Sequence, residues 1–281
     1  MGANKAKSKN KSDATPKTKS EVAPEELSER VIASNSKYTK PTEPAKPVKV
    51  AKASRALREE VCEANIELSK RGLAPFTFGN ASGVDREHGL IVIKPSGVPY
   101  SKIKPAMMVV TDLSGKTTEG DLRASSDLPT HVVLYNAFTE IGGVVHTHSH
   151  YATAWAQAAR EIPCYGTTHA DYFHGSIPVT AALNDEEINS EYETNTGHAI
   201  VKRFAGISPM RVPAVLVAGH ASFAWGKTVG DAVETMSVME QVARLAFDTV
   251  VLNSAVESLS QVLHDKHFLR KHGPDAYYGQ K

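Results

Sequence analysis

Cysteine is scarce in this sequence of 281 residues: Cys62 and Cys164 are the only two, and neither belongs to a C-x-x-C pattern. This scarcity excludes a disulfide-stapled scaffold and a cysteine zinc ribbon. Long apolar runs are missing too, since no stretch approaches the ~18 residues of a membrane span. No apolar segment of a signal peptide follows the basic N-terminus. We therefore expect a cytoplasmic protein without a membrane partner.

Net charge is also small, because 32 Lys and Arg residues oppose 31 Asp and Glu residues. The balance hides an asymmetry: residues 1–50 hold 11 basic and 6 acidic residues, and the remaining 231 residues hold 21 and 25. A mildly acidic body argues against a nucleic-acid partner held by a basic face. With 41% hydrophobic residues, the chain can bury a core.

The N-terminal segment has almost no aromatic residue and no sustained apolar period. Such composition cannot offset the entropy of ordering. We predict a disordered basic extension over residues 1–52 and a single domain over residues 53–281. The lysines of the extension are interpreted as a solvated tail, with a nucleic-acid or targeting signal as the alternative. Removing the extension is expected to leave the activity of the domain unchanged.

Helical and strand-like patterns alternate along the body. A helix is predicted from Ser54, with an apolar stripe ending at Gly72. Further helices are predicted over residues 132–138, 151–160 and 185–204, with more helical pattern from 231 to about 270. Strands are predicted over residues 90–94, 107–113, 144–148 and 214–219. The alternation predicts an α/β fold in which helices cover a sheet.

The histidines are the residues of this sequence with the strongest indication of a metal site. His146 and His148 follow an apolar run, and on a strand two residues spaced by two share one face and can bind one ion. A tetrahedral site needs one or two further ligands. His220, after a second predicted strand, and Asp127, in a loop that enters a helix, are well placed for this. An H-x-H pair also occurs as a packed or surface pair, so the pattern alone leaves both interpretations open.

Two other segments combine groups that bind ligands. Residues 166–173 hold two threonines, a histidine and Asp171, which indicates either a site positioned by the sheet or a self-bonded capping loop. The segments Lys94-Pro95-Ser96-Gly97 and Ser125-Ser126 join hydroxyls to backbone N–H groups, which suits a phosphate. An ordinary turn is the alternative. Nucleotide-binding and serine-hydrolase motifs are absent, since neither G-x-G-x-x-G after a strand nor G-x-S-x-G occurs.

Eight motifs in order make the body, residues 57–280, resemble the class II aldolase and adducin family. They are GNASGVDRE from Gly79, VIKPSGV from Val92, SSDLPTH from Ser125, IGGVVHTHS from Ile141, GTTHADYFHG from Gly166, FAWGK from Phe223, DKHFLRKHG from Asp265 and AYYGQ from Ala276. Within the family the likeness is strongest to the L-ribulose-5-phosphate 4-epimerases. The resemblance implies an α/β fold: a class II aldolase-like α/β/α sandwich whose mostly antiparallel or mixed central sheet is covered by helices.

The function that this resemblance implies is that of a zinc-dependent isomerase. It would interconvert L-ribulose 5-phosphate and D-xylulose 5-phosphate in pentose catabolism, for example of arabinose, by breaking and remaking the C3–C4 bond. The implied assembly is a homotetramer with active sites between subunits. Two alternatives stay open: a sister aldolase acting on fuculose or rhamnulose 1-phosphate, and an adducin-like interaction module without catalysis.

The resemblance also assigns roles to individual residues. The implied ligands of Zn²⁺ or another divalent cation are Asp127, His146, His148 and His220. The implied acid/base pair is Asp171 and Tyr278. The implied substrate contacts are Gly79, Asn80, Lys94, Ser96, Gly97, Ser125, Ser126, Thr167 and His267.

One departure from the family concerns the strand that bears the last metal ligand. The family commonly has His-Ser-His-Gly-Pro where this chain has Ala218-Gly219-His220-Ala221-Ser222. The ligand position survives and the first histidine is lost, so we expect a different metal affinity.

Overall fold

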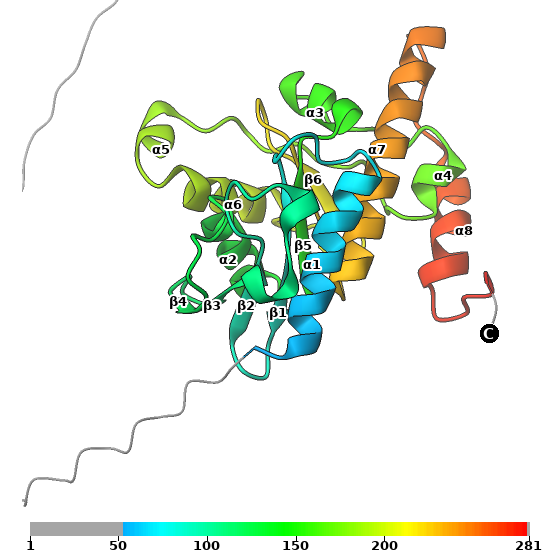
Figure 1. The fold of residues 1–281 in the computed structure, drawn as a ribbon. Helices are drawn as coiled ribbons and strands as arrows, with labels where there is room; N and C mark the ends of the chain where they lie inside the picture. The colour runs from blue at the N-terminus through cyan, green and yellow to red at the C-terminus, as the bar shows by residue number, and fades with distance from the viewer. Residues whose placement is uncertain (1–52, 280–281) are drawn as a thin grey trace, which may run out of the picture. The chain divides into compact units, whose positions relative to one another are not determined.

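The computed structural model describes residues 53–279, and its strands form one seven-stranded antiparallel sheet (Figure 1). The strand order is β4 (Thr117–Glu119), β3 (Val109–Asp112), β2 (Leu90–Ile93), β1 (Asn80–Asp85), β5 (Gly143–Thr147), β7 (Ser222–Gly226) and β6 (Ala214–Leu216). Every neighbouring pair is antiparallel, which agrees with the predicted sheet. The predicted extension over residues 1–52 lies outside the described residues.

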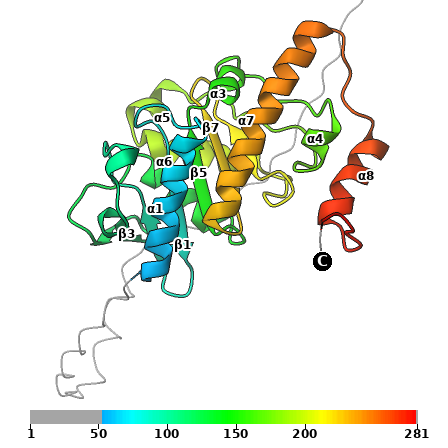
Figure 2. The same cartoon turned by 45° about the vertical axis from the view of Figure 1, so that its right-hand side comes forward.

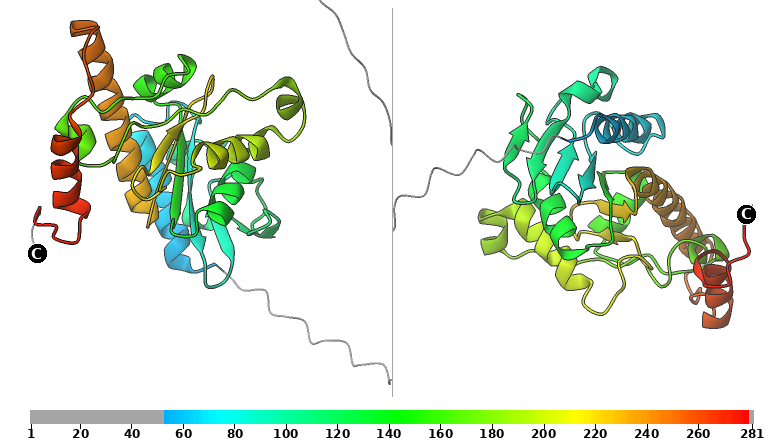
Figure 3. Two further views of the ribbon diagram at one scale, coloured as in Figure 1. Left: turned by 180° about the vertical axis from the view of Figure 1, so that it is seen from behind. Right: turned by 90° about the horizontal axis from the view of Figure 1, so that it is seen from below.

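Helices cover both faces of the sheet, because successive strand residues point to opposite sides. Val144 and Trp225 belong to the apolar cluster under α2 (Leu128–Ala137) and α6 (Tyr192–Arg203). Val145 and Ala224 belong to the cluster under α1 (Arg55–Lys70), α3 (His150–Gln157) and α7 (Val229–Leu252). The view from below in Figure 3 separates these layers, with α1 and α7 on one side and α6 on the other. The three-layer α/β architecture is therefore confirmed.

The helix predicted from Ser54 is confirmed as α1. The Ser54 hydroxyl accepts a hydrogen bond from the backbone N–H of Leu57, and Gly72 follows the helix with φ +70°. Within the predicted stripe, Val61 and Leu68 are fully buried. The apolar period thus identified both the helix and its buried face.

The single helix predicted over residues 185–204 is wrong. The structure has a short helix α5 (Asp185–Asn189), a break at Ser190 and then α6. Asn184 and Glu187 form a capping box that starts α5, and Ser190 ends the helix because its backbone, with φ −104° and ψ −118°, is not helical. The helical pattern predicted from residue 231 becomes α7 and α8 (Gln261–His272). None of the described helices is long and apolar enough to cross a membrane.

Several short elements were not predicted. They are β1, β4 and β7, the one-turn helix α4 (Thr167–Ala170) and the 3₁₀ turns η1 (Tyr100–Lys102) and η2 (Pro105–Met107). The sequence of β1 is NASGVD, whose asparagine, glycine and aspartate disfavour strands. Pairing with both β2 and β5 holds this strand in place despite its composition.

Gly143 lets β5 lie directly against the start of α7. A Cβ atom at this position would lie 2.5 Å from the Cα of Val229 and 2.6 Å from the carbonyl oxygen of Thr228. We expect Gly143→Ala to lower the free energy of unfolding by about 1–3 kcal/mol, measured by urea denaturation, because backbone must move. Gly230→Ala is the matched control, since its nearest neighbour atom would be 3.7 Å away. An equal loss in both variants would contradict the packing argument.

Candidate active site

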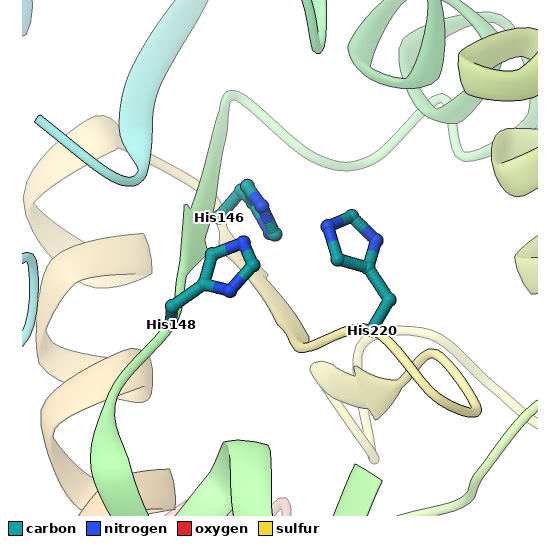
Figure 4. Close-up of side chains that lie close together, drawn as sticks. All are labelled: His146, His148 and His220. Carbon is teal, nitrogen blue, oxygen red and sulfur yellow. The ribbon is translucent and has the colours of Figure 1, made fainter. Parts of the chain in front are cut away.

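Three histidines meet where β5 ends beside the β6–β7 turn. His146 lies on β5, His148 follows the strand, and His220 lies in the turn, where Gly219 has φ +71°. One ring nitrogen from each of the three lies within 4.8 Å of the others, and each pair of ring centres is 5.0 Å apart. Figure 4 shows the rings turned toward one another. The sequence had proposed all three histidines as candidate ligands, and the fold brings them together.

The histidine cluster fits a divalent cation such as zinc. His146 Nδ1 donates to the carbonyl oxygen of Ser222 at 2.9 Å, which leaves Nε2 with a free lone pair. The Nδ1 of His220 is buried and has no hydrogen-bond partner among the described residues. Burial, reinforced by the neighbouring histidines, lowers the pKa of His220 to about 4. Neutral imidazole is the form that binds a metal, so the site is chemically prepared for one.

Asp127 lines the same cavity from the N-cap position of α2. Its Oδ2 accepts a hydrogen bond from Asn80 Nδ2 at 2.6 Å, and Asn80 is paired with His146 in the β1–β5 ladder. Burial raises the pKa of Asp127, but the electrostatic interactions with His146 and His131 and the Asn80 hydrogen bond outweigh it, so the pKa lies below its usual value. The carboxylate is therefore charged beside the cluster, although it lies outside the group of ligand atoms within 4.8 Å.

The two segments predicted to bind phosphate run side by side. Pro95 and Ala124 form an isolated bridge, and the backbone N–H of Ser125 donates to the carbonyl oxygen of Lys94 at 3.0 Å. Lys94 is 2% exposed, and its ammonium lies 3.3 Å from the Pro95 carbonyl oxygen and 4.9 Å from the ring centre of Tyr100. Burial lowers the pKa of Lys94. No described carboxylate forms an ion pair with this ammonium, which makes it available to an anion.

One cavity of about 410 Å³ joins the cluster to these segments. Eleven of the residues implied by the resemblance line it: Gly79, Asn80, Lys94, Ser96, Gly97, Ser125, Ser126, Asp127, His146, His148 and His220. Gly79 has φ +99°, and a Cβ there would lie 2.5 Å from the carbonyl oxygen of His146. Only glycine lets the loop pass so close to β5.

The other four implied residues form a second group, at α4 and α8. Asp171 ends α4, one turn after Thr167, and its Oδ1 lies 3.0 Å from His267 Nδ1 on α8. The ring of Tyr278 stacks over the guanidinium of Arg270, 4.9 Å away. None of the four lines the histidine cavity, and Figure 2 shows α4 and α8 beyond α7, which lies between them and β5. Within one chain the implied site is therefore divided into two parts.

Sequence reasoning missed some residues in both parts. Tyr192 and Glu193 line the histidine cavity from the start of α6, which the sequence placed inside a longer helix. Arg270 and Lys271 contact Asp171. Their spacing of three and four residues from His267 was a usable signal, because such positions share one helix face.

Comparisons with known proteins show the family of this chain. The family described as Class II Aldolase and Adducin N-terminal domain matches residues 59–247. L-ribulose-5-phosphate 4-epimerase UlaF of Salmonella paratyphi B is 52% identical over 225 residues, which cover 80% of this chain and 99% of that protein. A solved structure of L-fuculose 1-phosphate aldolase is 25% identical with a TM-score of 0.66, covering 76% of this chain and 95% of the other. This chain belongs to the class II aldolase and adducin family.

Proposed function

We propose that this protein is an L-ribulose-5-phosphate 4-epimerase, an isomerase that interconverts L-ribulose 5-phosphate and D-xylulose 5-phosphate. The observation that carries the proposal is the single cavity that is lined by the three-histidine cluster, by two hydroxyl-bearing loops and by a buried lysine that no described carboxylate neutralises. That arrangement suits a substrate with a metal-binding end and a phosphate end. The likeness to the Salmonella epimerases supports the choice of substrate.

The chemistry of the substrate dictates two requirements. C4 of a 2-ketopentose is not adjacent to the carbonyl, so simple enolisation cannot invert it. Breaking the C3–C4 bond gives an enediolate and glycolaldehyde phosphate, and re-forming the bond after the aldehyde rotates inverts C4. Zinc or another divalent cation, held by His146, His148, His220 and Asp127, would supply Lewis acidity that stabilises the enediolate. The cavity must hold both fragments until the bond re-forms.

The residues of the chain itself anchor the phosphate. Ser125 and Ser126 lie just before Asp127, the N-cap residue of α2, and both line the cavity, so the positive end of that helix lies beside the place proposed for the phosphate. Lys94 adds a full positive charge that no described carboxylate neutralises. In a body with more acidic than basic residues, positive potential for the substrate is thus concentrated at the cavity.

Proton transfer falls to Asp171 and Tyr278 in this proposal. The C4 hydroxyl loses a proton on one face, and the re-formed hydroxyl gains one on the other, so two groups are needed. Both residues lie apart from the histidine cavity of their own chain. We infer that they serve the cavity of a neighbouring chain, which makes the homotetramer a condition for activity. The tetramer, zinc and the cytoplasmic location stay predictions.

Product identity separates this proposal from its main rival. Solved structures of fuculose-phosphate aldolases share the fold, and an aldolase would release its aldehyde. We expect metal-loaded protein to convert L-ribulose 5-phosphate into D-xylulose 5-phosphate. Accumulation of dihydroxyacetone and glycolaldehyde phosphate without D-xylulose 5-phosphate would favour the aldolase. Protein that neither contains nor takes up a divalent ion would favour the adducin-like interaction module.

Lys94→Met tests the phosphate half of the cavity. Hydrogen bonds to charged groups contribute about 1.5–3 kcal/mol, so we expect the KM for L-ribulose 5-phosphate to rise roughly 10-fold to 100-fold with bound metal unchanged. Steady-state kinetics and elemental analysis measure both. Lys116→Met is the matched control, because Lys116 is exposed in the β3–β4 turn. An unchanged KM in Lys94→Met would show that the phosphate binds elsewhere.

A further inference from the structure

The Asp171 carboxylate is held by three side chains of α8: Arg270, His267 and Lys271. Arg270 donates to Oδ1 from Nε at 3.1 Å and from Nη2 at 2.9 Å, and Nη2 also reaches Oδ2 at 2.8 Å. His267 Nδ1 lies 3.0 Å from Oδ1, and Lys271 Nζ lies 3.6 Å from Oδ2. The backbone carbonyl of Asp171 accepts from His272 Nε2 at 2.9 Å. Two permanent positive charges thus face one carboxylate.

The donors divide unequally between the two carboxylate oxygens. Oδ1 takes three hydrogen bonds, two from Arg270 and one from His267. Oδ2 takes one hydrogen bond, from Arg270, with the Lys271 ammonium farther away. A carboxylate offers about four lone-pair sites in all. Oδ2 is therefore the oxygen with room to accept a proton.

The surroundings keep this carboxyl group charged. Burial raises the pKa of Asp171, but the hydrogen bonds from Arg270 and His267 and the charge of Lys271 outweigh burial, and the pKa falls below its usual value. On the facing helix α7, the carboxylate of Glu234 accepts a hydrogen bond at 3.1 Å from the hydroxyl of Tyr172, the residue after Asp171. Lys271 lies 4.5 Å from the ring centres of both Tyr172 and Tyr278, so the same cation also contacts the second member of the pair.

We propose that Arg270 is a positioning residue: it holds the Asp171 carboxylate ionised and in a fixed orientation, and it leaves Oδ2 as the atom that takes the proton. This inference rests on the proposed epimerase function. For one epimer, the C4 hydroxyl gives its proton to Oδ2 while C4 becomes an aldehyde carbon and the electron pair of the C3–C4 bond stays with C3. When the bond re-forms with C4 inverted, Tyr278 gives a proton to the oxygen on the other face. Oδ2 then releases its proton to solvent, from which Tyr278 is reprotonated.

The test is the acid limb of the pH profile of kcat/KM. A base works only above its pKa, so activity falls as pH drops through the pKa of Asp171. Arg270→Gln removes the guanidinium group that binds the carboxylate, together with its positive charge. This raises the pKa of Asp171 and moves the acid limb to higher pH. We expect the acid limb to move up by about one pH unit or more, which lowers kcat/KM roughly tenfold on the acid side. The bound metal should be unchanged. Arg270→Lys keeps the charge and should shift the acid limb less. The lysine variant replaces the glutamine variant in this test if the glutamine variant does not fold.

A titration that needs no activity separates this inference from the proposed function. The ¹³C carboxyl signal of Asp171, assigned with Asp171→Asn, should titrate at higher pH in Arg270→Gln than in the full-length wild-type protein. Arg55→Gln, in an exposed pair with Glu59, is the matched control and should change neither measurement. An unshifted carboxyl titration, or a loss of kcat that is equal at every pH, would overturn the role of Arg270. A shifted titration in a protein without epimerase activity would refute the proposed function alone.

Discussion

His148→Asn is expected to abolish both bound divalent metal and turnover. His148 is one of three histidines whose nitrogens lie within 4.8 Å of one another, and losing one leaves too few neutral nitrogen ligands. A metal contributes several kcal/mol of charge stabilisation in such reactions, so kcat should fall about a thousandfold or more. Elemental analysis gives the metal content, and the epimerase assay gives kcat.

The control for this variant is His88→Asn. His88 is an exposed histidine that pairs with Asp85 at 2.8 Å in the β1–β2 turn. It should keep wild-type metal and turnover. If His148→Asn kept its metal, or lost the metal and still epimerised L-ribulose 5-phosphate at the wild-type rate, the histidine cluster would not be the centre of the reaction.

Asp171→Asn and Tyr278→Phe should each lower kcat by about 10²–10⁴ and leave the metal in place. This magnitude is typical of losing a general acid or base. The metal survives because neither residue belongs to the histidine cluster proposed to hold it. Metal loss equal to that of His148→Asn would contradict the assignment of separate roles.

Co-expression of two inactive variants tests whether the site is shared between chains. A chain with His148→Asn keeps Asp171 and Tyr278 intact, and a chain with Asp171→Asn keeps the histidine cavity intact. Mixed oligomers, isolated with two affinity tags, should regain part of the wild-type activity. In some sites, the intact histidine cavity of one chain meets the intact Asp171 and Tyr278 of the other. Mixed oligomers as inactive as either parent would place each complete site within one chain.

The sequence predicted the parts of the site better than their arrangement. The strand spacing of His146 and His148 and the helix entry after Asp127 follow from local periodicity and capping, and both are present in the fold. The cavity depends on β1, whose sequence disfavours strands and whose position comes from pairing with two neighbours. Local pattern contains no such information.

The division into two groups is also invisible in a linear sequence. Asp171 follows the metal motif closely along the chain, yet α7 separates it from β5 in space. Its contact with Arg270 joins residues 99 positions apart. Only the docking of α8 against α4 reveals that the candidate base is held by a guanidinium fork.

The most direct test of the account follows L-ribulose 5-phosphate labelled with ¹³C at C3 and C4, in the presence of excess unlabelled glycolaldehyde phosphate. The account predicts D-xylulose 5-phosphate that keeps the ¹³C–¹³C coupling between C3 and C4, because both fragments stay in the cavity until the bond re-forms. Product that has lost the coupling, free labelled fragments alone, or no conversion by metal-loaded protein would contradict it.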